Sequence, residues 1–362
     1  MAQSLKTVSL FAFFMLCIVS YAGDNHVEND HAEDDYIENS HAKDDHAEGH
    51  KEPTIVENVL HHISDAHEWH FFDYHDHPVS IPLPVILYTD GHLDVFMSSA
   101  FKHGEKVVKK GDREYTIDHH GNITEANGLK ILDFSITKNV ASMFISLIIL
   151  VLILRKVAKS YNRNNGVPKG IQAFIEPVVL FIKDDVAKPN LGHNYKKYLP
   201  YLLTLFFFIL VNNLLGLLPG AANVTGNIAI TIVLSVITLL VTNISGKKAY
   251  WSHIFKPPGV PLALMPIMIP IEMVGILTKP FALMIRLFAN ITAGHIVILS
   301  LISLIFMAQS GLGTGGAYGV APVSVAFVLF MYLIELLVAF LQAYIFTLLT
   351  SLFIGLAIVE DH

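Results

Sequence analysis

The chain has 362 residues and a formal net charge of −7; 53% of its residues are hydrophobic and only 15% are charged. A soluble domain carries roughly 25% charged residues, so this composition excludes an ordinary soluble protein. No basic stripe with interleaved aromatic residues is present, which excludes a nucleic-acid-binding surface. A polar N-terminal third followed by long apolar runs indicates a membrane protein with a soluble N-terminal extension.

Residues 1–22 are typical of a secretory signal peptide. Lys6 precedes the short apolar stretch Val8–Val19, and small residues follow at the two positions of a cleavage site. A short first membrane helix is the alternative, but a span needs roughly 20 apolar residues. The single cysteine, Cys17, lies in this segment, so the mature chain is expected to have no disulfide and no thiol chemistry.

Residues 23–78 are a low-complexity stretch of His, Asp, Glu and Ala. They hold eleven of the 19 histidines, and the pattern His31–Asp35 recurs at His41–Asp45. This composition is typical of a solvated flexible arm with too few apolar residues to fold. Metal binding by the histidines is the alternative, but no ligand spacing supports a particular metal, and we expect neither a metal site nor a cofactor.

Residues 79–133 are predicted to form a small extracytoplasmic module that contains β-strands. The stretches Val85–Tyr88 and Leu93–Phe96 flank Asp90-Gly91, which is a strong signal for a hairpin turn. A second turn is predicted at His120–Asn122. The sequence does not indicate what this module does.

Residues 134–362 are predicted to be an all-α polytopic membrane domain with about five to six helices. The first span runs from Asn139 to Leu154, and the basic residues that follow it are typical of the cytoplasmic side. The N-terminal extension is therefore expected outside the membrane. Residues 198–218 and 227–242 form the next two spans, joined by an uncharged loop.

Two overlong apolar runs end the chain. Residues 261–307 are about twice as long as one upright span, and residues 322–358 are also too long. They are expected to form kinked segments or two long, strongly tilted helices, separated by a Gly-rich loop at Gly311–Gly319. If each run crosses once, this loop lies outside and the C-terminus lies in the cytoplasm.

Five ionisable side chains interrupt these apolar runs: Glu272, Lys279, Arg286, His295 and Glu335. A charge at the bilayer centre costs at least about 2.5–3.5 kcal/mol on insertion scales, so such groups usually face a wet cavity or each other. The alternatives are that Glu272 and Lys279 snorkel to an interface, and that His295 is a hydrogen-bonded core residue.

The spacing of these residues places most of them on one helical face. Glu272, Lys279 and Arg286 are seven residues apart, and Asn290 follows four residues later. At about 100° per residue these four side chains lie within roughly 40° of one another. His295 points to the opposite side of the helix.

The last apolar run carries a second polar stripe, because Glu335 and Gln342 are seven residues apart. The sequence thus predicts two long helices, one with a permanent cation and the other with a titratable acid. A structural ion pair between Arg286 and Glu335 is an alternative. For Asn290 and Gln342 the alternative is helix–helix hydrogen bonding.

Two motifs in these runs closely resemble F-type ATP synthase subunit a, and the resemblance covers roughly residues 134–362. Residues 278–280 (TKP) and 285–295 (IRLFANITAGH) are similar to its arginine helix. Residues 341–346 (LQAYIF) are similar to the facing stretch of its last helix, and Asn212-Asn213 before residues 217–219 (LLP) also fits.

The resemblance implies proton translocation through the membrane sector of a rotary ATP synthase. Two offset half-channels would bring protons to and from the carboxylates of a rotating proteolipid ring, and Arg286 would favour deprotonation and prevent a direct leak. Asn290 and Gln342 would be its polar neighbours. His295 and Glu335 stand where many bacterial relatives carry Glu and His, so this pair is exchanged here.

The resemblance also implies a role for Glu272 near the cytoplasmic exit, with Asn213 and Lys279 as further groups of the polar path. Gly216 departs from the pattern, because some relatives carry an acid there. The implied partners are the ring of c subunits, the peripheral-stalk b subunits, the rest of the complex and the bilayer. The chain would be a non-catalytic, multi-pass subunit of a bacterial inner membrane.

The sequence also allows two other functions. A secondary transporter or cation channel with an Arg/Glu/His site would predict inverted repeats, and no convincing repeat is present in the sequence. A metal-binding membrane protein would explain the His-rich arm but none of the spacing in residues 261–358.

Overall fold

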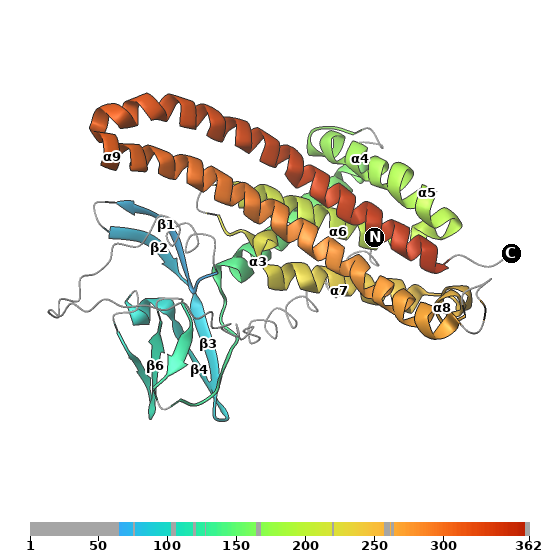
Figure 1. The fold of residues 1–362 in the computed structure, drawn as a ribbon, viewed down its shortest axis with the longest axis horizontal. Coiled ribbons are helices and arrows are strands. Elements are labelled where there is room, and N and C mark those ends of the chain that lie inside the picture. Colours follow the sequence, from blue (N-terminus) through green and yellow to red (C-terminus); the bar gives the residue numbers. More distant parts are fainter. Residues whose placement is uncertain are drawn as a thin grey trace, which may run out of the picture.

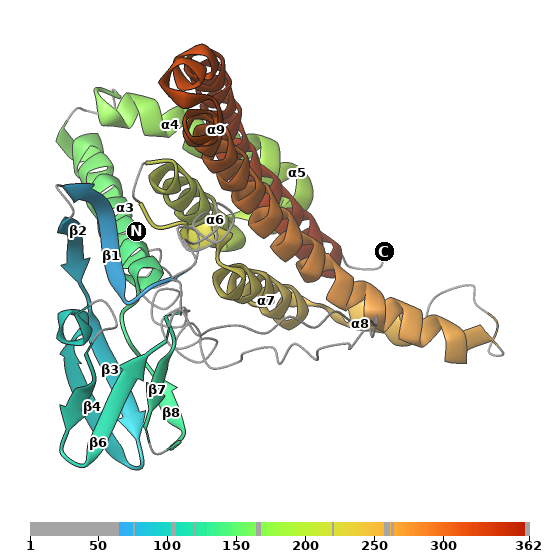
Figure 2. The ribbon, with the colours of Figure 1, turned by 60° about the vertical axis from the view of Figure 1, so that its left-hand side comes forward.

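The computed structural model describes residues 65–358 except for short gaps at 75–76, 103–105, 119–120, 127, 164–167, 219–220, 257–260 and 262–263. The predicted signal peptide and most of the predicted arm lie outside the described residues. The described chain consists of an N-terminal β module and a helical membrane part (Figure 1). The β module lies at one end of the molecule, and the helical residues around 248–275 lie at the opposite end (Figure 2).

The β module contains three small antiparallel sheets, with strand orders β1-β2, β4-β3-β8 and β5-β6-β7. The predicted turn at Asp90-Gly91 is confirmed, because both residues have positive φ angles (48° and 80°) between paired strands. The strands are β1 (Glu68–Tyr74), β2 (His77–Pro82), β3 (Pro84–Thr89), β4 (His92–Met97), β5 (Val108–Lys110), β6 (Arg113–Ile117), β7 (Ile123–Glu125) and β8 (Ile131–Asp133).

Strand structure begins before the predicted module boundary at residue 79. The hairpin of β1 and β2 lies within the stretch that the composition assigned to the flexible arm. Residues 69–74 (WHFFDY) explain the difference, since aromatic residues favour strands. Because His and Asp are abundant around these residues, the overall composition of the stretch did not indicate a strand.

The carboxylate of Asp65 forms hydrogen bonds at the junction between the β module and helix α3 (Lys138–Arg163). Asp65 accepts hydrogen bonds from the Thr137 hydroxyl (2.8 Å) and from the backbone N–H of Asn139 (3.2 Å). The N–H of Lys138 donates to the carbonyl of Ala66 (2.9 Å). Asp65 therefore satisfies a donor that the first turn of a helix leaves free, as an N-cap side chain does.

Replacing Asp65 with alanine is expected to loosen this junction. The loss of an N-cap side chain costs about 1 kcal/mol, so amide exchange at Asn139 should accelerate about fivefold in the assembled complex. Hydrogen–deuterium exchange measured by mass spectrometry on peptides that cover residues 134–142 checks this. Asp65→Asn retains an acceptor oxygen and should exchange like the wild type; equal protection in Asp65→Ala would contradict the capping role.

Every secondary-structure element assigned in the described membrane part is a helix, and four helical stretches are long and apolar enough to span a bilayer. Helix α6 is central: its side chains Leu205, Phe206 and Ile209 are fully buried, and it packs against α3 and α9. The elements after α3 are α4 (Ile171–Phe181), a π-helical turn (Ile182–Ala187), α5 (Lys188–Leu191), α6 (Tyr195–Gly216), α7 (Ile228–Ser245), α8 (Lys248–Phe255) and α9 (Met265–Ile358).

Helix α9 is a hairpin of two long limbs that lie side by side, residues 265–312 and 314–358 (Figure 1). The chain reverses at Gly313, whose φ of 72° and ψ of −173° are non-helical and suit glycine. A Cβ on Gly316 would lie 2.3 Å from the Cβ of Leu312, so the turn also needs glycine there. The predicted loop at Gly311–Gly319 is thus wrong in extent, because helix continues on both sides of Gly313.

Counted as two limbs, α9 joins α3, α6 and α7 as segments that are long and apolar enough to cross a membrane, which confirms the predicted all-α polytopic class. Large apolar side chains remain exposed along both limbs, among them Phe281, Leu333 and Leu337. Such a wide apolar face is compatible with contact with lipid or with other membrane subunits.

Candidate functional site

A buried acid lies between the two limbs of α9. The side chain of Glu335, on the second limb, is only 3% exposed. Its carboxylate rests on the backbone of the first limb at Gly294, where an added Cβ would lie 2.6 Å from Oε1. The Nε2 atom of His295 is 3.9 Å from the same oxygen. The structure therefore brings together the two predicted residues His295 and Glu335.

The carboxylate of Glu335 is also short of hydrogen bonds. Neither of its oxygens has a hydrogen-bond partner among the described residues. Burying a polar group without a partner costs free energy, and burying an unpaired charge costs more. An acid in this position within a membrane is typical of a group that takes part in proton transfer or faces a water path.

Arg286 lies on the first limb and is partly buried. Within the described part of the chain it has no carboxylate partner at ion-pair distance, so the alternative of a structural ion pair with Glu335 is not what the structure shows. Asn290, four residues later, is exposed, and Glu272 and Lys279 are partly exposed. The residues of the first polar stripe are thus partly or fully exposed in the described structure.

Asn213 connects α6 to the second limb close to Glu335. Its side-chain N–H donates to the carbonyl of Ala339 (3.1 Å), one turn after Glu335, and its oxygen accepts from the Thr225 hydroxyl (2.7 Å). Gln342 is buried on the same limb. Asn213 and Gln342 therefore belong to a buried polar region that extends from Glu335 into the protein.

Two residues at this site were not found from the sequence. Gly294 is needed because Glu335 packs directly on its backbone, and Thr225 holds Asn213 in place from the short 3₁₀ turn Val224–Gly226. Thr225 lies in the uncharged loop between α6 and α7, and that lack of charge was the only available signal. Nothing in the spacing of Gly294 distinguished it from other glycines.

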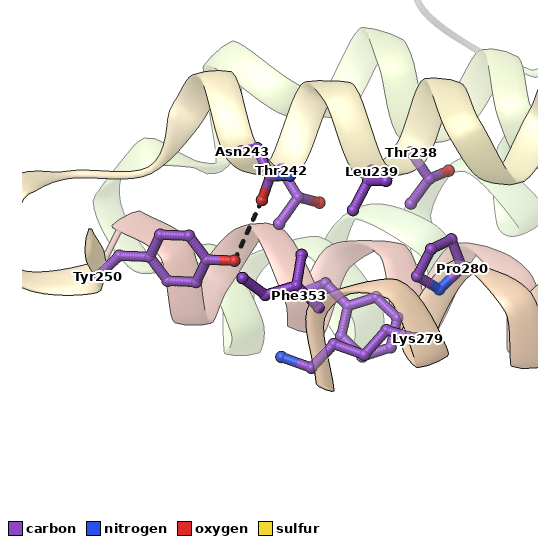
Figure 3. Close-up of a pocket in the computed structure, with 9 residues that line it drawn as sticks. Thr238, Leu239, Thr242, Asn243, Tyr250, Lys279, Pro280 and Phe353 are labelled. Atoms are coloured by element: carbon purple, nitrogen blue, oxygen red, sulfur yellow. Dashed lines mark hydrogen bonds between the residues drawn. The ribbon is translucent and has the colours of Figure 1, made fainter. Parts of the chain in front are cut away.

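At the other end of the first limb, Lys279 and Glu272 lie near helix α8. The Nζ atom of Lys279 is 5.5 Å from the centre of the Phe353 ring, which is a cation–π distance (Figure 3). Burial and the negative charge of Glu272 raise the pKa of the Tyr250 phenol above its usual value. The structure does not bring Glu272 and Lys279 into contact with His295 and Glu335.

Comparison with known proteins settles the family. The sequence model of the ATP synthase A chain matches residues 140–355, which is more than half of the chain. The chain belongs to the F-type ATP synthase subunit a family. Residues 58–141, which include the β module, match a domain of unknown function, DUF8433.

Several bacterial subunits a are similar to this chain. The ATP synthase subunit a of Chloroherpeton thalassium is 50% identical over 238 residues, which cover 64% of this chain and 69% of that protein. ATP synthase subunit a 2 of Chlorobaculum tepidum is 52% identical over 62% of this chain and 64% of its own length. For the subunit a of Chlorobium phaeobacteroides the identity is 44%, over 73% and 82%.

Because it belongs to this family, the chain is a component of the Fo membrane sector of a bacterial ATP synthase. It passes several times through the inner membrane. Family membership also decides against the secondary-transporter and metal-binding interpretations as the main function, because neither belongs to this family. The family match does not assign roles to individual side chains.

Proposed function

We propose that this subunit a conducts protons through two offset half-channels that meet the carboxylates of a rotating c ring along the first limb of α9. The observation that carries the proposal is the buried Glu335 carboxylate, which has no hydrogen-bond partner in the described chain and faces His295. If Glu335 had only a structural role, no hydrogen bond or ion pair would offset the free-energy cost of burying its carboxylate. A role in proton transfer explains why it is both buried and unpaired.

In this proposal the outer half-channel passes Glu335 and His295. Carboxylate and imidazole can each accept and release a proton. The distance of 3.9 Å between Oε1 and Nε2 is longer than a hydrogen bond but short enough for one bond to form after a small movement or through a water. Asn213 and Gln342 line the continuation of this path.

Unlike Glu335 and His295, Arg286 does not relay protons in this proposal, because its guanidinium stays protonated in proteins. Facing the c ring, its positive charge favours the ionised form of a ring carboxylate and promotes release of the proton. The same charge separates the outer and inner paths. Asn290, which is exposed one turn away, is a further polar contact on this face.

The inner half-channel leads past Glu272 to the cytoplasm. In this arrangement the N-terminal module is outside and the C-terminus is in the cytoplasm, as the basic residues after α3 indicate. A proton that crosses both paths releases about 2.3 kcal/mol of free energy per 100 mV of membrane potential.

Since the two paths are offset, the ring must turn to connect them. The b subunits hold this stator subunit in place. The chain itself carries out no ATP chemistry.

The substitution Glu335→Gln tests this role for the acid. It preserves shape but removes the titratable proton, so ATP-driven proton pumping in inverted membrane vesicles should fall by at least about tenfold, in line with the usual contribution of a positioned acid or base. Quenching of a pH-sensitive dye measures the pumping. The amount of assembled complex is measured in the same membranes.

Two further variants make this test specific. Thr347→Val removes a buried hydroxyl of the same limb that donates to the carbonyl of Ala343, and it should pump normally. The exchange variant with His295→Glu and Glu335→His should pump better than either single substitution, because only the order of the relay changes. Normal pumping by Glu335→Gln in assembled complexes would overturn the proposal.

A further inference from the structure

One face of the sheet formed by β4, β3 and β8 is apolar, and none of the described elements covers it. The opposite face packs against the sheet of β5, β6 and β7, where Val85, Leu87 and Tyr115 contribute to a buried core (Figure 2). Side chains alternate between the two faces along a strand, so the neighbours of Val85 and Leu87 in β3 point away from this core. An antiparallel sheet that exposes its second face to water usually carries polar residues on it.

This outward face is apolar on all three strands. The register places Tyr88 between Leu93 of β4 and Leu132 of β8. After β8 the N–H of Phe134 donates to the carbonyl of Ile86 (2.9 Å), which continues the ladder. The outward residues, which we call the apolar sheet face, are Pro84, Ile86, Tyr88, Leu93, Val95, Met97, Leu132, Phe134 and Ile136. The exposed fraction reaches 62% at Leu93, and contiguous exposed apolar patches mark interaction sites.

The sequence directly before the described residues supplies a matching segment. Residues 54–63 (TIVENVLHHI) carry apolar side chains at positions 55, 56, 59, 60 and 63. On a helix these five lie within roughly 140° of one another, and the polar side chains at 57, 58, 61 and 62 lie on the other side. Ten helical residues are about 15 Å long and about 10 Å wide. Five residues of β3 and three adjacent strands give the apolar sheet face about the same length and width.

The point at which this segment joins the described chain lies beside the apolar sheet face. Only Ser64 separates the segment from Asp65, whose carboxylate accepts hydrogen bonds from Thr137 and Asn139. Ile136, at one end of the face, directly precedes Thr137. A short connection gives a tethered segment an effective concentration of about millimolar at a site within its reach. The match to DUF8433 also begins within this segment, at residue 58, ahead of the first strand.

We propose that residues 54–63 form an amphipathic helix that docks on the apolar sheet face. The helix buries the second face of the sheet, so the module has three layers: a helix, the sheet of β4, β3 and β8, and the sheet of β5, β6 and β7. The docked helix anchors the His-rich stretch before it next to the start of α3. This interaction is independent of the proposed route of protons.

The reactivity of a cysteine on the face tests the docking in the assembled complex. In a Cys17→Ser background, Val95→Cys is treated with a membrane-impermeant maleimide in membrane fragments that are open to both sides. It should react at least tenfold more slowly than Thr124→Cys, which is exposed on β7 of the other sheet. Fast labelling of Val95→Cys, at the rate of Thr124→Cys, would overturn the proposal.

Charges on the apolar side of the segment should uncover the face. Replacing Val59 and Ile63 with aspartate should raise the labelling rate of Val95→Cys at least tenfold, because unpaired charges are costly to bury. The matched control replaces Asn58 and His62 with aspartate on the polar side and should leave the rate unchanged. Equal rates with the two pairs of aspartates would overturn the proposal and assign slow labelling to the bilayer or another subunit.

A disulfide identifies the segment that covers the face. Leu60→Cys is combined in turn with cysteine at Ile86, Val95 or Phe134, and mild oxidation should link at least one pair within a single chain. Mass spectrometry of the linked peptides measures the yield. The same three positions paired with His61→Cys should link at least tenfold less, because His61 lies on the polar side. A disulfide between two copies of the subunit, or no link from Leu60→Cys, would overturn the proposal.

Discussion

ATP-driven proton pumping is expected to disappear when Arg286 is replaced by alanine. The structure leaves this guanidinium partly buried and without a carboxylate partner among the described residues. In the proposed function, its positive charge acts on an acid of the c ring. No second arginine of the described first limb can take over this role.

Coulomb's law indicates the size of the effect. At roughly 4 Å and an effective dielectric constant of about 20, two unit charges interact with about 4 kcal/mol. Since one pKa unit corresponds to about 1.4 kcal/mol, loss of Arg286 would raise the pKa of a facing ring carboxylate by about three units. Deprotonation on the side of Arg286 would then be about a thousand times less favourable.

The measurement compares dye quenching in vesicles that contain Arg286→Ala, Arg286→Lys or Arg155→Ala. Arg155 is an exposed arginine in the C-terminal half of α3 and serves as the matched control for the loss of one arginine. Arg286→Lys keeps the charge but not the planar fork of donors, so it should retain partial pumping. Passive proton leak should rise in Arg286→Ala, and normal pumping by assembled complexes would refute the proposed role.

The sequence was sufficient to select the charged residues of the candidate site because charges are rare in apolar runs. Glu335 and Arg286 are conspicuous against such a background, and the seven-residue spacing predicts which side chains share a face of each limb. The contact between Glu335 and His295 was expected from the resemblance, not from spacing. Which turn of one limb faces which turn of the other depends on the reversal at Gly313, and no local pattern specifies that.

Other features could not be predicted for physical reasons. The Gly-rich stretch before Gly319 predicts a loop from intrinsic propensity. In the structure it is helical except at Gly313, because helix propagates at low cost from the long limbs on both sides. The bond between Thr225 and Asn213 depends on how a short turn folds back onto α6. The role of Asp65 as a cap requires a residue more than 70 positions upstream of Thr137 to return to the start of α3.

Gly294→Ala is expected to damage proton translocation almost as much as loss of the acid itself. The new Cβ would lie 2.6 Å from Oε1 and 3.0 Å from Cδ of Glu335. Because Glu335 is buried, its carboxylate can move only by leaving its preferred rotamer, which costs about 0.5–1.5 kcal/mol, or by moving away from His295. A displacement of about 1 Å at a reacting group can cost about a hundredfold in rate, so pumping should fall at least tenfold.

A shorter acid should relieve this clash. Glu335→Asp withdraws the carboxylate by one methylene group, so the double variant with Gly294→Ala should pump better than Gly294→Ala alone. Gly319→Ala is the matched control, since a Cβ at that helical position of the second limb meets no atom within 4 Å. If Gly294→Ala and Gly319→Ala pump equally well, close packing of Glu335 against the first limb has no part in function. If the aspartate variant restores pumping, the loss in Gly294→Ala comes from the position of the carboxylate, because the added methyl group is still present.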